Sequence, residues 1–206
     1  MYGEYISKHA ICLQSGAGYG IISAEIFLLE ETMTPTIKQP LFVVTGASGV
    51  GKSTTCEELF RNEAGKPYLV MESDILWDDP FDTPEDNYRA LRTVWMTLCA
   101  NISQCGKPVV LCGCATPDQF EVLPERDLFT EIHYLAVVCS DEALEDRMKN
   151  GRGIEDEDWL RVSYNFNRWL KEHAAETNPP ITLLDITGKT PAEAAEALEQ
   201  WILSRL

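Results

Sequence analysis

The sequence is poor in basic residues and in long apolar runs. Its 206 residues include 17 Lys and Arg against 33 Asp and Glu, which gives a formal net charge of −16. Such a chain repels nucleic acid and anionic lipid. The most apolar stretch near the N-terminus, residues 21–29, is interrupted by Glu25 and is too short to cross a bilayer. The first residues also lack the basic segment of a signal peptide. We expect a cytoplasmic protein with neither a nucleic-acid nor a membrane partner.

The sequence also lacks any pair of cysteines separated by two residues. Its seven cysteines are an odd number. Both features argue against a disulfide framework and against a zinc site, and they favour a reducing cytosol. Cys112 and Cys114 flank Gly113 at the end of an apolar run, and we expect them to be small buried thiols on a strand.

Short apolar segments alternate with amphipathic ones along most of the chain. The apolar segments, which predict buried parallel strands, are residues 41–45, 68–71, 109–112, 132–139 and 181–184. The helical segments follow Lys52, cover residues 84–104, 141–150 and 156–175, and begin again at Thr190 and Pro191. Strands alternating with helices favour right-handed crossovers and a sheet covered on both faces. The sequence therefore predicts a three-layer α/β domain over residues 40–206, preceded by an N-terminal extension over residues 1–39.

The first predicted strand leads into Gly46-Ala-Ser-Gly-Val-Gly-Lys-Ser53, which matches G-x-x-x-x-G-K-[ST] at every fixed position. The glycines let the backbone curl into a cradle of N–H groups for phosphate, and the next helix offers its N-terminus to the same anion. Lys52 can reach the β and γ phosphates of ATP, and the Ser53 hydroxyl can ligate Mg²⁺. The residues predicted to bind the nucleotide are Gly46, Ala47, Ser48, Gly49, Val50, Gly51, Lys52, Ser53 and Thr54.

The second predicted strand ends in Glu72-Ser73-Asp74. A carboxylate at the carboxyl end of a neighbouring parallel strand faces the crevice in which ligands bind. Asp74 can accept a proton from an attacking hydroxyl or hold Mg²⁺ through water. We expect Glu72 to point to the other side of the strand, which makes Asp74 the better candidate. The structural alternative for Asp74 is a turn or a helix cap.

Arg147 and Arg152 bracket the end of the helix after the fourth strand, beside Gly151 and Gly153. Arginines that close over a transferring phosphoryl group stabilise its spreading charge, and glycines permit a mobile lid. The candidate catalytic residues are Lys52, Asp74, Arg147 and Arg152, and the candidate metal ligands are Ser53 and Asp74.

Arg89 and Arg92 lie three residues apart on one face of the helix after an acidic segment. They can bind an anionic acceptor or pair with Glu85 and Asp86. We expect the second arrangement, at a solvated surface.

Together, residues 46–53, Asp74, the Gly113 region and residues 140–147 resemble the small P-loop kinases. These include shikimate-, gluconate- and nucleoside-kinase-like proteins, with chloramphenicol phosphotransferase and tunicamycin-resistance-type proteins as distant look-alikes. The resemblance covers residues 40–206 and implies a P-loop NTPase fold with a parallel sheet of order 2-3-1-4-5 and a short lid. It also implies ATP with Mg²⁺ as donor, and adenine packed on residues 185–188. The chain departs from the family in its lid, which has fewer basic residues, and at residues 112–114.

The leading hypothesis is an enzyme that moves the γ-phosphoryl group of ATP to a small metabolite, such as a nucleoside, a nucleotide, a sugar acid or an antibiotic-like hydroxyl compound. The alternative is a nucleotide-binding regulatory protein with slow ATP hydrolysis. Asp74 together with Arg147 and Arg152 favours the enzyme, because a binder needs the phosphate loop alone.

The N-terminal residues 1–32 lie outside the family pattern, and Met33 stands a few residues before the first strand. We expect a chain that starts at Met33 to keep the melting temperature and the ATP affinity of the full chain, because the first strand leads directly into the phosphate loop. The competing hypothesis is that residues 21–29 pack an amphipathic segment onto the domain or onto a second subunit. A loss of several degrees in melting temperature, or of solubility, would favour it.

Overall fold

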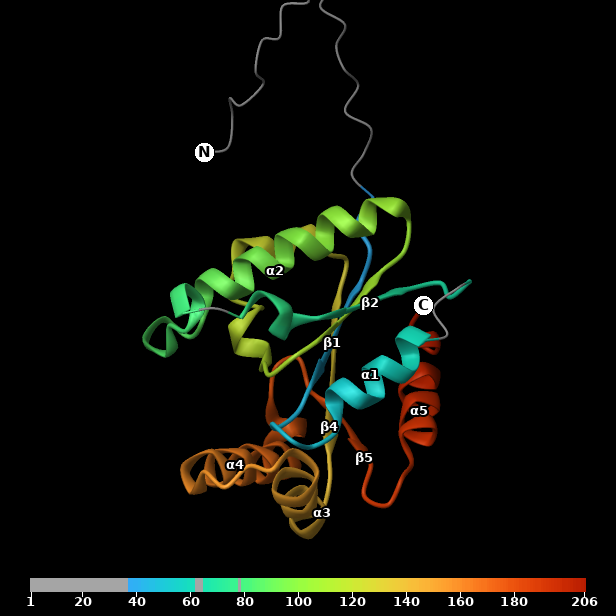
Figure 1. The fold of residues 1–206 in the computed structure, drawn as a ribbon. Coiled ribbons are helices and arrows are strands. Elements are labelled where there is room, and N and C mark those ends of the chain that lie inside the picture. Colours follow the sequence, from blue (N-terminus) through green and yellow to red (C-terminus); the bar gives the residue numbers. More distant parts are fainter. Residues whose placement is uncertain (1–36, 62–64, 78) are drawn as a thin grey trace, which may run out of the picture. The chain divides into compact units, whose positions relative to one another are not determined.

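The computed structural model describes residues 37–61, 65–77 and 79–206 (Figure 1). Its strands are β1 (Leu41–Thr45), β2 (Leu69–Glu72), β3 (Val109–Cys112), β4 (Ile132–Val138) and β5 (Thr182–Asp185). Its α-helices are α1 (Lys52–Arg61), α2 (Arg89–Ile102), α3 (Asp141–Asp146), α4 (Glu157–His173) and α5 (Pro191–Leu203). The predicted alternation of strands and helices is confirmed.

The five strands form one parallel sheet of order β2-β3-β1-β4-β5. This is the order that the resemblance to P-loop kinases implies. β1 lies at the centre, with Val44 beside Cys112 of β3 and beside Leu135 of β4. The phosphate loop therefore leaves the middle of the sheet at its carboxyl edge, where ligands of parallel sheets bind.

Each face of the sheet carries its own apolar core, because successive side chains of a strand point to opposite faces. Phe42 and Val44 of β1 pack with residues of α1 and α5, whereas Leu41 and Val43 pack with residues of α2 and the C-terminal part of α4. Figure 1 shows α1 and α5 together on one side of the strands and α2 on the other. All residues of β1 are buried, which explains why this strand is a continuous apolar run rather than an alternating one.

Two helices begin as the sequence predicts. The side chain of Ser140 accepts a hydrogen bond from the backbone N–H of Ala143 at the start of α3. Thr190 and Glu193 form a capping box at the start of α5, with Pro191 in its first turn. These caps place the β4–α3 and β5–α5 loops firmly at the carboxyl edge of the sheet.

The predicted helix over residues 84–104 is wrong in its first turn. Residues Pro84–Asp86 form a separate 3-10 turn, and α2 begins only at Arg89. Asn87 and Tyr88 separate the two with φ angles of 61° and 58°. A right-handed helix cannot pass through two left-handed residues, so the chain changes direction here.

The cysteines differ from the expectation in two respects. The structure joins Cys56 of α1 to Cys112 of β3 by a disulfide, although the sequence argued against disulfides. Cys114 is exposed rather than buried, because β3 ends at Cys112 and the chain has left the core by that point. Pairing of this kind depends on the packing of α1 against β3, which cysteine spacing does not reveal.

The predicted boundary at residue 39 lies next to residues 1–36, which are outside the described part of the chain, so the N-terminal extension stays a prediction. In the described part, the backbone carbonyl of Gln39 accepts a hydrogen bond from the N–H of Thr130, and the buried apolar residues begin at Leu41. No helix in the described ranges is both long enough and apolar enough to cross a membrane.

Candidate functional site

The phosphate loop occupies the turn between β1 and α1 and has a backbone that requires glycine. Gly46 and Gly49 have φ angles of 151° and 79°. A methyl group at Gly46 would overlap the carbonyl oxygen of Val137, and one at Gly49 would overlap the side chain of Met148. The loop is therefore fixed from both sides, by β4 and by the segment after α3. A backbone of this shape turns successive N–H groups toward one centre, which suits phosphate oxygens.

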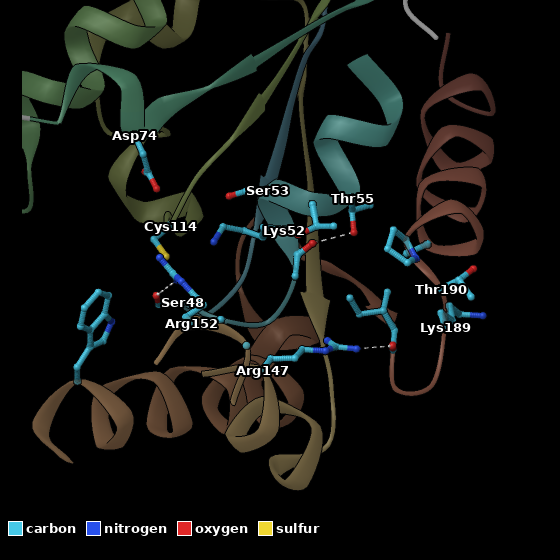
Figure 2. A pocket seen from close by; sticks show the side chains of 18 residues that line it. Ser48, Lys52, Ser53, Thr55, Asp74, Cys114, Arg147, Arg152, Lys189 and Thr190 are labelled. Carbon is cyan, nitrogen blue, oxygen red and sulfur yellow. Dashed lines mark hydrogen bonds between the residues drawn. The ribbon is translucent and has the colours of Figure 1, made fainter. Parts of the chain in front are cut away.

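A cavity of about 650 Å³ opens over this loop (Figure 2). Lys52 and Ser53 line it from the first turn of α1. The Lys52 side chain is only 7% exposed, so its cation is directed into the cavity rather than into bulk water. Thr55 donates a hydrogen bond of 2.9 Å to the carbonyl of Gly51, which ties α1 to the loop. The predicted nucleotide-binding residues thus lie together at one end of α1, where the helix dipole also favours an anion.

Arg147 also lines the cavity, but its guanidinium is engaged with the backbone. It donates hydrogen bonds to the carbonyl of Val50 in the phosphate loop and, at 3.2 Å, to the carbonyl of Ile186 after β5. It stands at the start of a π-helical turn, Arg147–Gly151, that continues α3. Arg147 therefore links two loops of the site. The sequence singled out this residue as a candidate site residue but could not predict these backbone contacts.

Arg152 has a different environment, although it lies only five residues further along. Its guanidinium donates a 3.1 Å hydrogen bond to the Ser48 hydroxyl and lies 5.7 Å from the centre of the Trp159 ring. Both Arg152 and Trp159 are exposed and line the cavity. Ser48 belongs to the phosphate loop, so Arg152 holds its positive charge over the place where the phosphates would lie. The stretch predicted as a lid, residues 147–153, consists of this helical turn and the two residues after it, and the N-cap of α4, Asp156, follows.

Asp74 lines the same cavity from the opposite side, together with Cys114. It belongs to a short 3-10 helix, Ser73–Leu76, that directly follows β2. In Figure 2 the Lys52 amino group points toward the side of the cavity that Asp74 and Cys114 occupy. A methyl group at Gly113 would overlap the Ser73 hydroxyl, so only glycine allows the ends of β2 and β3 to approach so closely. The predicted carboxylate and the predicted phosphate loop are thus brought together.

Glu72 is a residue that the sequence analysis set aside wrongly. Burial raises the pKa of Glu72, the charge of Asp74 raises it further, and the charge of Lys52 and a hydrogen bond with the Ser53 hydroxyl act in the opposite direction. Glu72 therefore faces the phosphate loop. Residues two positions apart on a strand point to the same face, so alternation places Glu72 on the side of Asp74, and the expectation that it points to the other side is wrong. One of its carboxylate oxygens is buried and has no hydrogen-bond partner.

The far end of the cavity is formed by the loop after β5. Ile186, Lys189, Thr190 and Pro191 line it there. In Figure 2 this end lies on the side away from Asp74, beyond Thr55. The resemblance implies that this loop packs on adenine, and in the structure the loop lies at the end of the cavity opposite to Asp74. The cavity therefore has two ends, one at the loop after β5 and one at Asp74, with the phosphate loop between them.

The residues present fit a magnesium ion bound with a nucleotide. The described residues contain no group of three or more His, Cys, Asp or Glu side chains placed to hold a metal by themselves. Mg²⁺ in phosphate sites needs only one or two protein ligands, because phosphate oxygens and water supply the others. The Ser53 hydroxyl and the unpartnered carboxylate oxygen of Glu72 are suitable, and Asp74 stands nearby.

Comparison with known proteins supports this picture. The family model described as "AAA domain" matches residues 43–166, which is more than half of the chain. No curated protein matches the sequence. Among solved structures, a gluconokinase from Sinorhizobium meliloti 1021 aligns with a TM-score of 0.52 at 18% identity, over 76% of this chain and 87% of that one.

A second solved structure gives the same result. A sugar kinase from Janibacter sp. HTCC2649 aligns with a TM-score of 0.56 at 18% identity, over 81% of this chain and 95% of that one. At this level of identity the structural matches establish the fold. The sheet order, the phosphate loop and the family match agree, and the chain therefore belongs to the AAA-domain family and has the fold of the small P-loop kinases.

Proposed function

We propose that this protein is a cytoplasmic ATP-dependent phosphotransferase, which moves the γ-phosphoryl group to a small-molecule acceptor, and that residues 40–206 form its catalytic domain. One observation carries the proposal. The cavity over the phosphate loop continues past Lys52 to a carboxylate, Asp74, and is bordered there by the cation of Arg152. A protein that only binds a nucleotide has no need for this second end.

Each residue has a distinct chemical task. Lys52 meets the β and γ phosphates, and its charge interacts most strongly with the group in transfer. Asp74 accepts the proton of the attacking hydroxyl. Arg152, held by Ser48 and Trp159, adds positive charge as the phosphoryl oxygens become more negative. Ser53 and either Glu72 or Asp74 would hold Mg²⁺ on the protein side, and the ion would supply positive charge against that of the phosphates.

The acceptor remains a proposal at the level of a class. The two matching structures are kinases named for gluconate and for sugars, which supports a polyhydroxylated acceptor. Nucleosides, nucleotides and antibiotic-like hydroxyl compounds should be tested as acceptors in the same assay. Incubation of the protein with ATP, Mg²⁺ and each candidate, with ADP release as the readout, identifies the acceptor. ADP release that no candidate accelerates would favour the alternative, a nucleotide-binding regulatory protein with slow hydrolysis.

Replacement of Lys52 by Ala should reduce turnover at least a hundredfold, which corresponds to about 2.7 kcal/mol in the barrier. The loss is expected because the removed charge meets the transferring group more strongly than it meets bound ATP. Steady-state kinetics with the identified acceptor measures the effect. Unchanged turnover would contradict the proposed transfer.

Replacement of Asp74 by Asn should abolish transfer and leave ATP affinity within a few-fold of the wild type. The amide has almost the same shape as the carboxylate but cannot accept the proton. Titration with a fluorescent ATP analogue gives the affinity, and ADP release gives the rate. A collapse of ATP affinity would assign Asp74 to the metal or to the structure of the site instead.

Replacement of Arg147 and replacement of Arg152 should have different effects in the same assays. Arg147→Ala should lower the melting temperature and weaken ATP binding, because Arg147 holds the carbonyls of two loops that border the nucleotide. Arg152→Ala should lower kcat more than ATP affinity, because its exposed charge is available to the transition state. Equal losses of rate and affinity in both variants would show that neither arginine discriminates the transition state.

A further inference from the structure

Three cysteines gather around the carboxyl end of β3. Cys56 of α1 forms a disulfide with Cys112, the last residue of β3, and Cys114 follows Cys112 after a single glycine. Cys114 is free and exposed. The proposed phosphotransfer uses none of these three sulfur atoms, although Cys114 lines the same cavity as Lys52.

The disulfide itself is shielded from solvent. Cys112 is fully buried and Cys56 is 4% exposed, and both belong to the apolar core on the α1 and α5 side of the sheet. A disulfide is opened by a thiolate that attacks one of its two sulfur atoms, so a dissolved thiol would first have to enter this core. Disulfides of cytosolic proteins are usually transient and serve in catalysis or redox sensing. In the proposed cytoplasmic location, the lifetime of the bond therefore depends on whether a thiol can reach it from the surface.

Cys114 connects the buried disulfide with the surface. Its side chain lines the cavity (Figure 2), and its sulfur donates a 3.0 Å hydrogen bond to the carbonyl of Gly46, the first residue of the phosphate loop. The N–H of Gly113 donates to the carbonyl of Val44, which lies beside Cys112 in the sheet. Both contacts hold residues 112–114 against the end of β1. Gly113 and Cys114 form a bend after β3, and a bend brings Cα atoms two residues apart within the reach of a disulfide.

The disulfide also anchors the helix that carries nucleotide-binding residues. Cys56 lies one turn after Lys52 on α1, and β3 is an inner strand between β2 and β1. The bonded cysteines are separated by 56 positions, and the loop that they close includes Asp74. A bond that closes a long loop restricts the unfolded chain strongly and therefore stabilises the folded one. Its loss should loosen α1 together with Lys52 and Ser53.

We propose that Cys114 is a thiol–disulfide exchange site, through which small thiols such as glutathione open the Cys56–Cys112 disulfide and thereby weaken nucleotide binding. The Cys114 thiolate attacks the sulfur of Cys112, a Cys112–Cys114 disulfide forms, and Cys56 leaves and takes up the proton that Cys114 has lost. This new disulfide borders the cavity. The inference goes beyond the proposed phosphotransfer and requires only that the phosphate loop binds a nucleotide.

External thiols complete the reduction. The first one attacks the Cys114 sulfur and remains bound to it as a mixed disulfide, while Cys112 leaves as a thiol. A second external thiol attacks the mixed disulfide, releases Cys114 as a thiol and departs as the oxidised external disulfide. The protein thus gains two electrons and two protons, and two small thiols are oxidised to one disulfide.

The first experiment measures how fast the disulfide opens. The full chain is incubated with reduced glutathione, samples are quenched with acid, and the Cys56 peptide is assayed for a free thiol by alkylation and mass spectrometry. Cys114→Ser should slow the opening at least tenfold, because no thiol then connects the cavity with the core. Cys105→Ser is the matched control, since Cys105 is also free and exposed but lies after α2, and its rate should stay within twofold of the wild type. Equal rates in Cys114→Ser and the wild type would overturn the exchange site.

The second experiment traps the exchange product. Cys56→Ser leaves Cys112 and Cys114 without the competing bond, and oxidised glutathione should convert them into a Cys112–Cys114 disulfide, seen as the loss of two hydrogen atoms from the peptide that contains both. With Cys112→Ser added, the reaction should stop at glutathione on Cys114. Glutathione that stays on Cys114 in Cys56→Ser would overturn the exchange step. If Cys56→Ser does not fold, the half-reduced wild type is mapped for the same bond.

The third experiment tests the effect on the nucleotide. Titration with a fluorescent ATP analogue should show at least fivefold weaker binding to the reduced wild type than to the oxidised one, with a melting temperature lower by several degrees, and reoxidation should restore both. Cys56→Ser should behave as the reduced wild type at either glutathione ratio. Equal affinity in the two states would overturn the control of nucleotide binding. None of these readouts involves an acceptor, so if they hold while no acceptor is phosphorylated, the proposed phosphotransfer fails and the exchange site stands.

Discussion

The close packing of the phosphate loop is the constraint on which the rest of the site depends. Gly46 and Gly49 leave no space for a side chain, because Val137 of β4 and Met148 after α3 lie against them. The loop is therefore shaped by elements that follow it by about a hundred residues, and not by its own sequence alone. Arg147 strengthens the same connection, because its guanidinium bonds to the carbonyls of Val50 and Ile186. A nucleotide-binding loop that is fixed in this way is preorganised, so little ordering is required when phosphate binds.

Those parts of the fold that depend on local pattern could be predicted from the sequence. The buried strands are continuous apolar runs, and β1 and β3 have the predicted bounds. α3 and α5 begin where the sequence predicts, with Ser140 and Thr190 as their caps, because capping is decided by a few neighbouring residues. The order of the strands came from the resemblance carried by the phosphate loop, since strand pairing is not visible in apolar runs. The motif of the same loop predicted that Lys52 and Ser53 stand side by side at the phosphate loop, and both line the cavity.

The features that could not be predicted depend on contacts between distant segments. Glu72 interacts with Lys52 and Ser53, which lie about twenty residues before it, and the apolar pattern of β2 does not show this contact. The left-handed pair at Asn87 and Tyr88 is held by Asp118 and Gln119, about thirty residues away. Without that contact, residues 84–104 have the composition of one continuous helix. The burial of Arg92, which the sequence was expected to place at a solvated surface, follows from this break.

Arg147, Arg152 and Arg92 differ in the partners that their guanidinium groups already have. Arg147 uses its donors on backbone carbonyls, which suits a residue that keeps the loops in place before any ligand arrives. Arg152 has a neutral hydroxyl and an aromatic ring as partners, and either can be exchanged for phosphate oxygens at small cost. Arg92 has a carbonyl and two rings but no counter-charge, and it is the most deeply buried of the three. The donors of Arg147 are therefore committed to the fold, whereas Arg152 and Arg92 keep a charge that their neutral partners match less completely.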